Sequence, residues 1–175
     1  MLYQVPGLLL NYHNPVIFLQ LLLGPRFFLP GENSVFIYNS GNNSWSTKNL
    51  SQPRYLISPA NVQGKLYFAG GGSTISGGMA SNAIDIYDPS TDAWSVSSLS
   101  KPKFGIASVG MRGKTLWAGG TTSNGITNEV EFFDFNTQST TFACLFQANS
   151  FSQYRTARKD IMLFFGVMMG QKKII

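Results

Sequence analysis

The sequence contains a single cysteine, Cys144, and a single histidine, His13. One cysteine allows neither a disulfide within the chain nor a zinc site built from cysteines. One histidine excludes copper, iron or zinc centres with several histidine ligands, and the region from residue 34 to residue 166 has no histidine for a Ser-His-Asp triad. We therefore expect no catalytic residue, no metal ligand and no cofactor.

Charged residues are also scarce, at 12% of the 175 residues, which is about half the usual share. The formal net charge is +5, and most of it lies near the C-terminus. The charged residues there are Arg155, Arg158, Lys159, Asp160, Lys172 and Lys173. Because the rest of the chain is nearly neutral, a groove for nucleic acid is not expected.

The chain has no long uninterrupted apolar run. Its longest candidate, Val16–Leu29, is broken by Gln20, Gly24 and Pro25, so it is too short to span a bilayer. The first basic residue is Arg26, and the N-terminus therefore lacks the charged region that begins a signal peptide. We expect no membrane partner, and the missing signal peptide slightly favours an intracellular location.

Glycine and aromatic residues are plentiful. The chain has 18 Gly, 14 Phe and 7 Tyr, and hydrophobic residues make up 43%. Many turns and many aromatics suit short β-strands better than helices, whose surfaces are rich in Glu and Lys. A chain of this length corresponds to about one domain. The composition therefore favours an all-β protein.

An internal repeat carries most of the information. Tyr38 recurs as Tyr87 and Trp45 as Trp94, each 49 residues later. The other pairs at this spacing are Leu50 and Leu99, Pro53 and Pro102, Arg54 and Lys103, Gly64-Lys65 and Gly113-Lys114, and Gly70-Gly71 and Gly119-Gly120. A third, weaker copy follows 46 residues later, where Phe133-Asp134 replaces Tyr87-Asp88.

Each repeat predicts four short strands. In the clearest copy these are Leu56–Val62, Lys65–Ala69, Ala83–Tyr87 and Ala93–Val96. The alternation of Ile84 and Ile86 has the period of a strand. Pro89–Asp92 predicts a tight turn. Asp88, which directly precedes it, is predicted to be a turn former, as is Asp134 in the next copy. Cys144 follows the last strand of the third copy in an apolar setting and is predicted to be buried.

These residues resemble the kelch motif: Ile86-Tyr87-Asp88-Pro89, then Trp94 and Leu99, then Gly113-Lys114 and Gly119-Gly120. The resemblance covers about Ser34 to Gly166. It implies that each repeat of about 50 residues is one four-stranded blade of a β-propeller. The residues expected to have purely structural roles are Tyr38, Trp45, Gly70, Gly71, Tyr87, Trp94, Gly119 and Gly120.

The number of blades is too small for a closed ring. The chain provides the outer strands of one blade (Ser34–Lys48), two complete blades (Tyr55–Val96 and Phe104–Phe142) and the inner strands of another (Ser152–Phe165). That is about three blades, whereas propellers close with four to eight. Three explanations remain open: a truncated chain, an open stack of blades, or a homodimer. In the homodimer, the C-terminal inner strands of one copy would pair with the N-terminal outer strands of the other and close a shared ring.

The predicted organisation has three parts. Residues 1–31 form an apolar N-terminal segment, in which Arg26–Gly31 weakly echoes half a blade. Residues 32–170 form the kelch-repeat blades, and residues 171–175 form a basic tail.

The binding face is predicted where the long loops emerge, because binding usually resides in loops held by a rigid scaffold. These loops are Gly72–Asn82 and Thr121–Asn128, joined by the blade-to-blade connections. The candidate partner-binding residues are Ser73, Thr74, Ser76, Met79, Asn82, Thr122, Asn124, Arg54, Lys101 and Lys103. The three cations would favour an acidic partner. The alternatives are a solvated surface or, for Arg54 and its repeat partner Lys103, a role in blade packing.

Resemblance to the kelch family implies a non-catalytic module that presents its loops to a protein partner. One alternative is a carbohydrate-binding or carbohydrate-active propeller, although the two long loops contain no Trp or Tyr. Another is a truncated remnant without independent function, which the eroded third repeat favours.

Overall fold

A computed structural model describes residues 26–31, 33–39, 42–74, 76–111, 113–146, 152–154 and 164–166. All regular elements within these ranges are β-strands, so the all-β prediction is confirmed. In the same ranges, no helix is long and apolar enough to cross a membrane.

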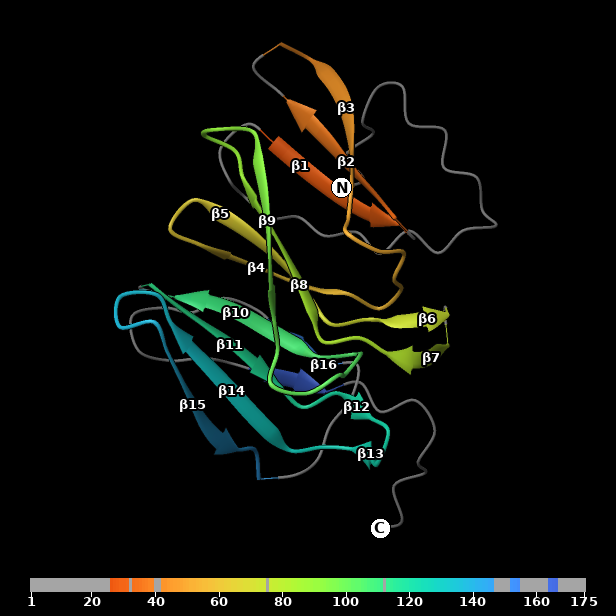
Figure 1. The fold of residues 1–175 in the computed structure, drawn as a ribbon, viewed down its shortest axis with the longest axis vertical. Helices are drawn as coiled ribbons and strands as arrows, with labels where there is room; N and C mark the ends of the chain where they lie inside the picture. Colours follow the sequence, from red (N-terminus) through yellow and green to blue (C-terminus); the bar gives the residue numbers. More distant parts are fainter. Residues whose placement is uncertain are drawn as a thin grey trace.

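Two four-stranded antiparallel sheets form the centre of the molecule (Figure 1). The second blade contains β4 (Ser58–Val62), β5 (Lys65–Ala69), β8 (Ala83–Asp88) and β9 (Ala93–Ser98) in that order. The third blade contains β10 (Ala107–Met111), β11 (Lys114–Ala118), β14 (Glu129–Asp134) and β15 (Ser139–Cys144). The predicted strands are confirmed within a few residues. β4 begins later than predicted because Leu56 has a φ of 55°, which is incompatible with an extended strand.

Strands at the two ends of the chain complete the arrangement. The first blade contains β1 (Arg26–Gly31), β2 (Ser34–Asn39) and β3 (Ser44–Asn49), and β16 (Ser152–Tyr154) pairs with β17 (Phe164–Gly166). β1 pairs with the inner edge of β2. A shared ring in which the C-terminal strands of a second copy pair with β2 would require β1 to leave that edge, and such a ring stays a prediction.

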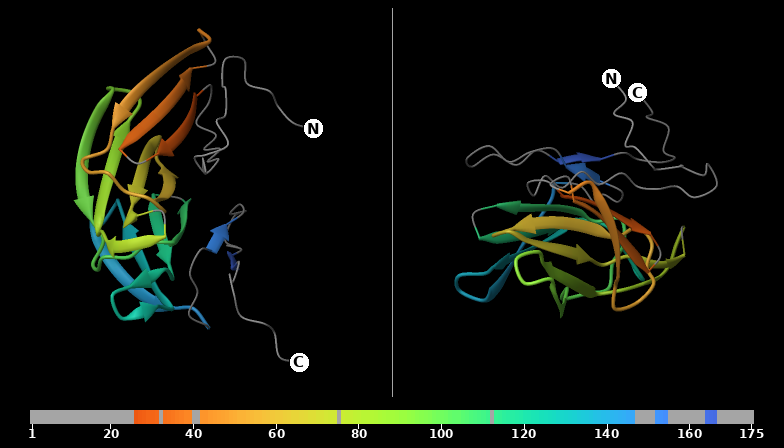
Figure 2. Two further views of the ribbon diagram at one scale, coloured as in Figure 1. Left: turned by 90° about the vertical axis from the view of Figure 1, so that its right-hand side faces the viewer. Right: turned by 90° about the horizontal axis from the view of Figure 1, so that it is seen from above.

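The blades are stacked in chain order, and the described strands do not close a ring (Figures 1 and 2). The inner strands β4 and β10 lie side by side. The Ser58 hydroxyl donates to the Ile106 carbonyl at 2.7 Å, and the Ser108 hydroxyl donates to the Pro59 carbonyl. Only glycine fits at position 110, because a Cβ there would overlap the backbone of Asn61.

Apolar layers fill the space between blades. Val35, Ile37 and Leu50 pack against Leu66, Phe68 and Tyr87 between the first and second blades, and Trp94 lies beside them. The Trp94 ring lies 5.0 Å from the Tyr87 ring and 5.9 Å from the Phe68 ring, measured between centroids. Each such buried side chain contributes about 1.5–3 kcal/mol. Tyr87 and Trp94 therefore join two blades, which is a structural role.

The acidic residues at the strand ends form the turns. Asp88 accepts hydrogen bonds from the backbone and hydroxyl of Ser90 at 3.0 and 2.6 Å. These bonds, together with Lys65 at 3.1 Å, lower the pKa of Asp88 to about 2. Asp134 accepts from the Asn136 amide at 2.9 Å. Both residues are turn formers, as predicted.

Cys144 corrects one expectation. It was predicted to be buried, but it is exposed at the end of β15. β15 is the outermost strand of its sheet, and every residue of β15 is exposed, so the apolar sequence around Cys144 does not create a buried setting.

Candidate interaction face

The two long loops form hairpins on the same side of the molecule, at the right in Figure 1. The first hairpin consists of β6 (Gly72–Thr74) and β7 (Gly77–Ala80). The second consists of β12 (Thr121–Thr122) and β13 (Gly125–Ile126). Each hairpin connects the second strand of its blade to the third. We call this surface, together with Lys101, the hairpin face.

Backbone hydrogen bonds hold both hairpins to the blade-to-blade connections. Tyr55 and Gly72 exchange two bonds of 2.8 Å, and Phe104 and Thr121 exchange two bonds of 3.0 and 2.8 Å. Two isolated β-bridges result. Because four backbone groups are satisfied in each repeat, the hairpins are fixed to the scaffold.

The repeated glycines make these connections possible. Gly70, Gly71, Gly119 and Gly120 have φ values of 64°, 111°, 65° and 96°, a region that other residues rarely adopt. A Cβ on Gly71 would lie 2.7 Å from the Tyr55 carbonyl oxygen, and a Cβ on Gly120 would lie 2.8 Å from that of Phe104. The backbones approach too closely there for any side chain.

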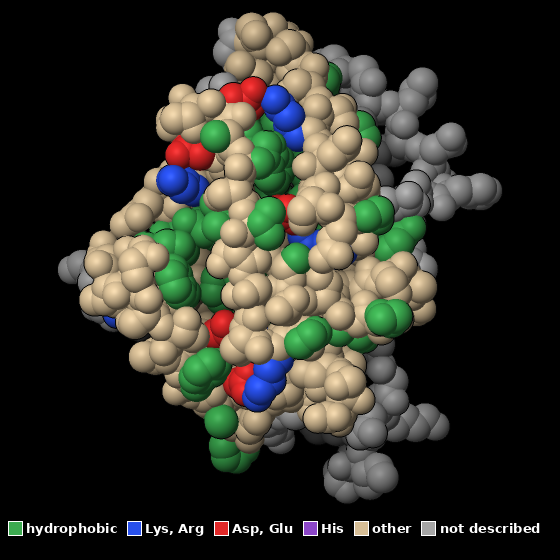
Figure 3. Space-filling view, viewed as in Figure 1, with side chains coloured by type: hydrophobic (Ala, Val, Ile, Leu, Met, Phe, Trp, Pro, Cys, Tyr) green, Lys and Arg blue, Asp and Glu red, His purple; other side chains and the backbone are tan. Residues whose placement is uncertain are grey.

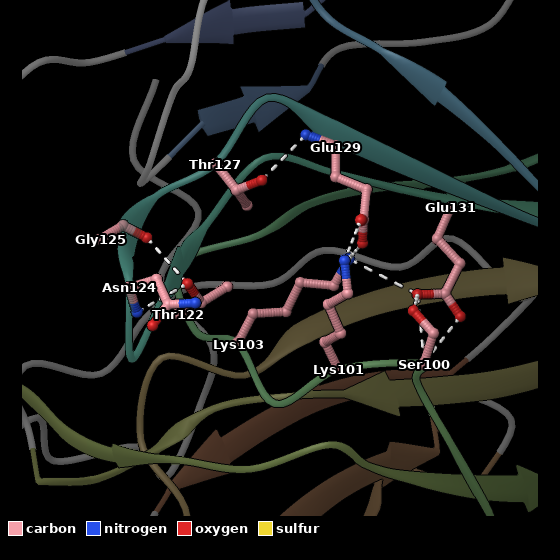
Figure 4. Close-up of polar contacts among 9 residues, drawn as sticks. All are labelled: Ser100, Lys101, Lys103, Thr122, Asn124, Gly125, Thr127, Glu129 and Glu131. Carbon is pink, nitrogen blue, oxygen red and sulfur yellow. Dashed lines mark hydrogen bonds and ion pairs between the residues drawn. The ribbon is translucent and has the colours of Figure 1, made fainter.

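Most of the predicted contact residues lie on this face. Exposed positions are Ser73, Thr74, Ser76, Met79, Asn82 and Asn124, and Thr122 is half-buried. Some hydroxyls are already used within the hairpins, because Ser73 accepts from the Met79 amide at 3.0 Å and Thr122 accepts from the Asn124 amide at 3.1 Å (Figure 4). Met79 is 82% exposed.

Ile126 is a residue that the sequence analysis missed. It lies on β13 and is 57% exposed, on the same side of the molecule as the β6–β7 hairpin that carries Met79 (Figure 1). Ile126 could have been identified from the sequence, because it is an isolated large apolar residue within a loop of Gly, Ser, Thr and Asn.

Arg54 does not belong to this surface. Only 2% of its side chain is exposed, and it forms an ion pair with Asp85, which is buried to the same extent. Its guanidinium also donates to the carbonyl oxygens of Gly70 and Ala83. Burial lowers the pKa of Arg54, an effect that Asp85 opposes. The prediction of a partner contact is wrong for Arg54, because its donors face the interior; the alternative of a packing role fits.

Lys103 is buried in the same way in the third blade. It is 0% exposed, and its Nζ lies 3.5 Å from Glu131 and 3.6 Å from Glu129 (Figure 4). A partner cannot reach this ammonium group, so the predicted contact is wrong for Lys103 as well.

A repeated network links each connection to its own blade. The Ser51 amide donates to Asp85 at 2.9 Å, and the Ser100 amide donates to Glu131 at 3.0 Å. Ser51 and Arg54 therefore share one carboxylate, as Ser100 and Lys103 share another. The sequence shows both acids, Asp85 and Glu131, on outer strands, but sequence reasoning did not pair them with Arg54 and Lys103, although each repeat contains both a base and an acid at these positions.

Lys101 is the predicted cation that remains at the surface. It is 62% exposed and pairs with Glu129 at 2.6 Å. This hydrogen bond raises the pKa of Lys101 and is the main cause that lowers the pKa of Glu129. Its charge is thus matched by a neighbouring carboxylate.

Charge is sparse over the visible surface. On the side shown in Figure 3, acidic and basic groups lie side by side in a few small clusters, and uncharged surface dominates. In the described ranges, no three His, Cys, Asp or Glu side chains gather closely enough to hold a metal ion.

Stacked four-stranded antiparallel sheets, with strands in chain order and inner strands side by side, are blades of a β-propeller. Residues 53–98 match the family model of the kelch motif. These residues include the whole second blade, so that blade is a kelch repeat and the predicted resemblance is confirmed.

The fold is also similar to a solved structure, that of YjhT, with a TM-score of 0.61 and 16% sequence identity. The match covers 74% of this chain and 52% of the other, so the chain corresponds to about half the length of that protein. At this identity the likeness shows the fold alone. No curated protein is significantly similar in sequence.

Proposed function

We propose that this chain is a protein-interaction module without chemistry of its own, and that its hairpin face contacts the partner. The observation that carries this proposal is the pair of large apolar side chains on fixed hairpins, Met79 at 82% and Ile126 at 57% exposure. Apolar side chains surrounded by uncharged polar groups are typical of interfaces.

The build of the face supports this role. Because the hairpins are fixed before binding, little conformational entropy is lost when a partner docks. The unbranched Met79 side chain can adapt to different surfaces. The hydroxyl and amide groups of Ser73, Ser76 and Asn124 would supply hydrogen bonds beside the two apolar side chains.

The partner's contact segment is expected to be apolar with uncharged polar groups. The sequence-based expectation of an acidic partner rests on Arg54, Lys101 and Lys103, but Arg54 and Lys103 are buried and Lys101 pairs with Glu129. Charge attraction is therefore a minor part of the proposed recognition.

The carbohydrate alternative has less support. Sugar rings commonly stack on exposed aromatic faces, and the described residues of the two hairpins include no aromatic side chain. The alternative of a remnant without function stays a prediction.

The test compares proteins captured from a cell extract by the wild-type chain, a Met79→Asp/Ile126→Asp variant and a Val96→Asp control. Val96 is 62% exposed but lies on the outermost strand β9 of the second blade. For any protein that the wild type captures specifically, we expect the double variant to capture at least tenfold less. The control should capture as much as the wild type. Equal capture by all three chains would contradict the proposed face.

A further inference from the structure

The outward side of the third blade carries a hollow. It is lined by Lys114, Phe132, Asp134, Ser139 and Thr141. These residues come from β11, β14 and β15, and strand pairing places Phe132 opposite Thr141. Phe132 packs with the apolar layer of the third blade, not with the layer shared with the second blade. The hollow therefore opens away from the second blade.

The corresponding position on the second blade is filled. By the repeat spacing, Phe132 corresponds to Ile86. Ile86 packs in the layer between the second and third blades together with Phe133 and Phe135. The Phe135 ring lies 4.9 Å from Tyr67 and 4.7 Å from Phe133. Tyr67 is paired with Ile86 across β5 and β8, so aromatic side chains of the next blade lie in the layer that covers Ile86.

The rims of the two sites also match. Lys114 pairs with Asp134 at 3.0 Å beside the hollow, and Lys65 pairs with Asp88 at 3.1 Å at the corresponding place on the second blade. A satisfied ion pair at the rim is therefore compatible with an aromatic side chain in the centre.

The first blade shows an apolar side chain at the opposite end of the stack. Val35 and Ile37 are 0% and 3% exposed and pack toward the second blade. Side chains alternate along a strand, so Phe36 faces the other way, and it is 44% exposed.

We propose that copies of this chain associate head to tail, with the outward face of the first blade of one copy docking on the hollow of the third blade of another. The contact would reproduce the outer part of the packing between the second and third blades, with β2 and β3 over β14 and β15. The inner part of that side is already occupied, because β16 lies beside β10. It joins two different surfaces, so it forms a ring if the rotation closes and a longer chain if it does not. It does not use the hairpin face, so the two proposals stand or fall separately.

The experiment uses two single variants and their mixture. Thr141→Arg obstructs the hollow and Phe36→Glu places a charge on the first blade; both positions are exposed. Every head-to-tail contact needs one intact copy of each surface. We therefore expect each variant alone to show the mass of one chain, 19.2 kDa, by light scattering, and a 1:1 mixture to form a dimer.

The wild type should form assemblies larger than one chain, and Val96→Asp should behave like the wild type. A concentration of about 100 µM exceeds the dissociation constant of a specific contact in the micromolar range. The proposal would be overturned if the wild-type chain remained monomeric at that concentration. It would also be overturned by a mixture that stays monomeric, or by single variants that associate as the wild type does. Thermal melts check folding, and Ser139→Arg replaces Thr141→Arg if that variant melts below the wild type.

Discussion

Arg54 and Asp85 form an ion pair inside the second blade, with only 2% of each side chain exposed. Asp85 also accepts a hydrogen bond from the Ser51 amide, and Arg54 donates to the carbonyls that flank the hairpin. A residue that the sequence placed among the partner contacts is thus a central element of the scaffold.

Breaking this pair should be costly. Asp85→Ala leaves a buried guanidinium without its counter-charge, and we expect the free energy of unfolding to fall by about 3–5 kcal/mol. Replacing both residues, as in Arg54→Met/Asp85→Leu, should cost less than Asp85→Ala, because no uncompensated charge remains. Urea unfolding of the three chains measures both differences. A loss below about 1 kcal/mol for Asp85→Ala, the range of an exposed pair, would contradict the buried network.

Two neighbouring lysines should differ sharply. Lys103→Ala removes a buried cation between Glu129 and Glu131, and we expect a loss of about 3 kcal/mol or more. Lys101→Ala removes an exposed partner of Glu129 and should change stability by about 0–1 kcal/mol. Parallel thermal and urea melts compare the two variants. Similar losses for both would mean that Lys103 is not buried as described.

The stability contribution of Asp88 should depend on pH. The pKa of its carboxyl is lowered to about 2 in the folded chain, compared with about 3.9 in an unfolded one. A lowered folded-state pKa contributes stability that is fully present above pH 4 and is lost as the pH falls toward 2. Wild type should therefore be more stable than Asp88→Asn at pH 6, with the difference shrinking toward pH 2. A difference independent of pH between 6 and 2 would exclude this origin.

Two glycines with positive φ provide a matched comparison. Gly71 has a φ of 111°, and a Cβ there would lie 2.7 Å from the Tyr55 carbonyl oxygen. Gly64 has a φ of 78° but no atom within 4 Å of an added Cβ. Gly64→Ala should cost about 1–2 kcal/mol through backbone strain. Gly71→Ala should cost more, because the backbone must also move. Urea melts give both values, and equal losses would show that the close approach has no cost.

Local pattern was enough to predict the blades. The strand periods, the turn at Pro89–Asp92 and the repeated Tyr87 and Trp94 all depend on residues close together in the sequence or on the 49-residue spacing. The structure agrees with these predictions because a repeat must bury the same face against each neighbour. From the sequence, the hairpins β6–β7 and β12–β13 are expected to be loops. Their short strand pairings depend on backbone contacts with Tyr55 and Phe104, which local sequence pattern does not show.

The sequence by itself determined the all-β class, the kelch-type blades and the side of the blades on which the long connections emerge. Only the tertiary structure decided which charged and apolar groups remain at the surface. Arg54 pairs with Asp85, which follows it by 31 residues in the chain. A basic side chain is therefore predicted to be exposed unless the acidic residue that pairs with it in the interior is known. Conversely, Cys144 and Ile126 are exposed despite their apolar character, because their burial depends on which neighbouring segment covers the strand.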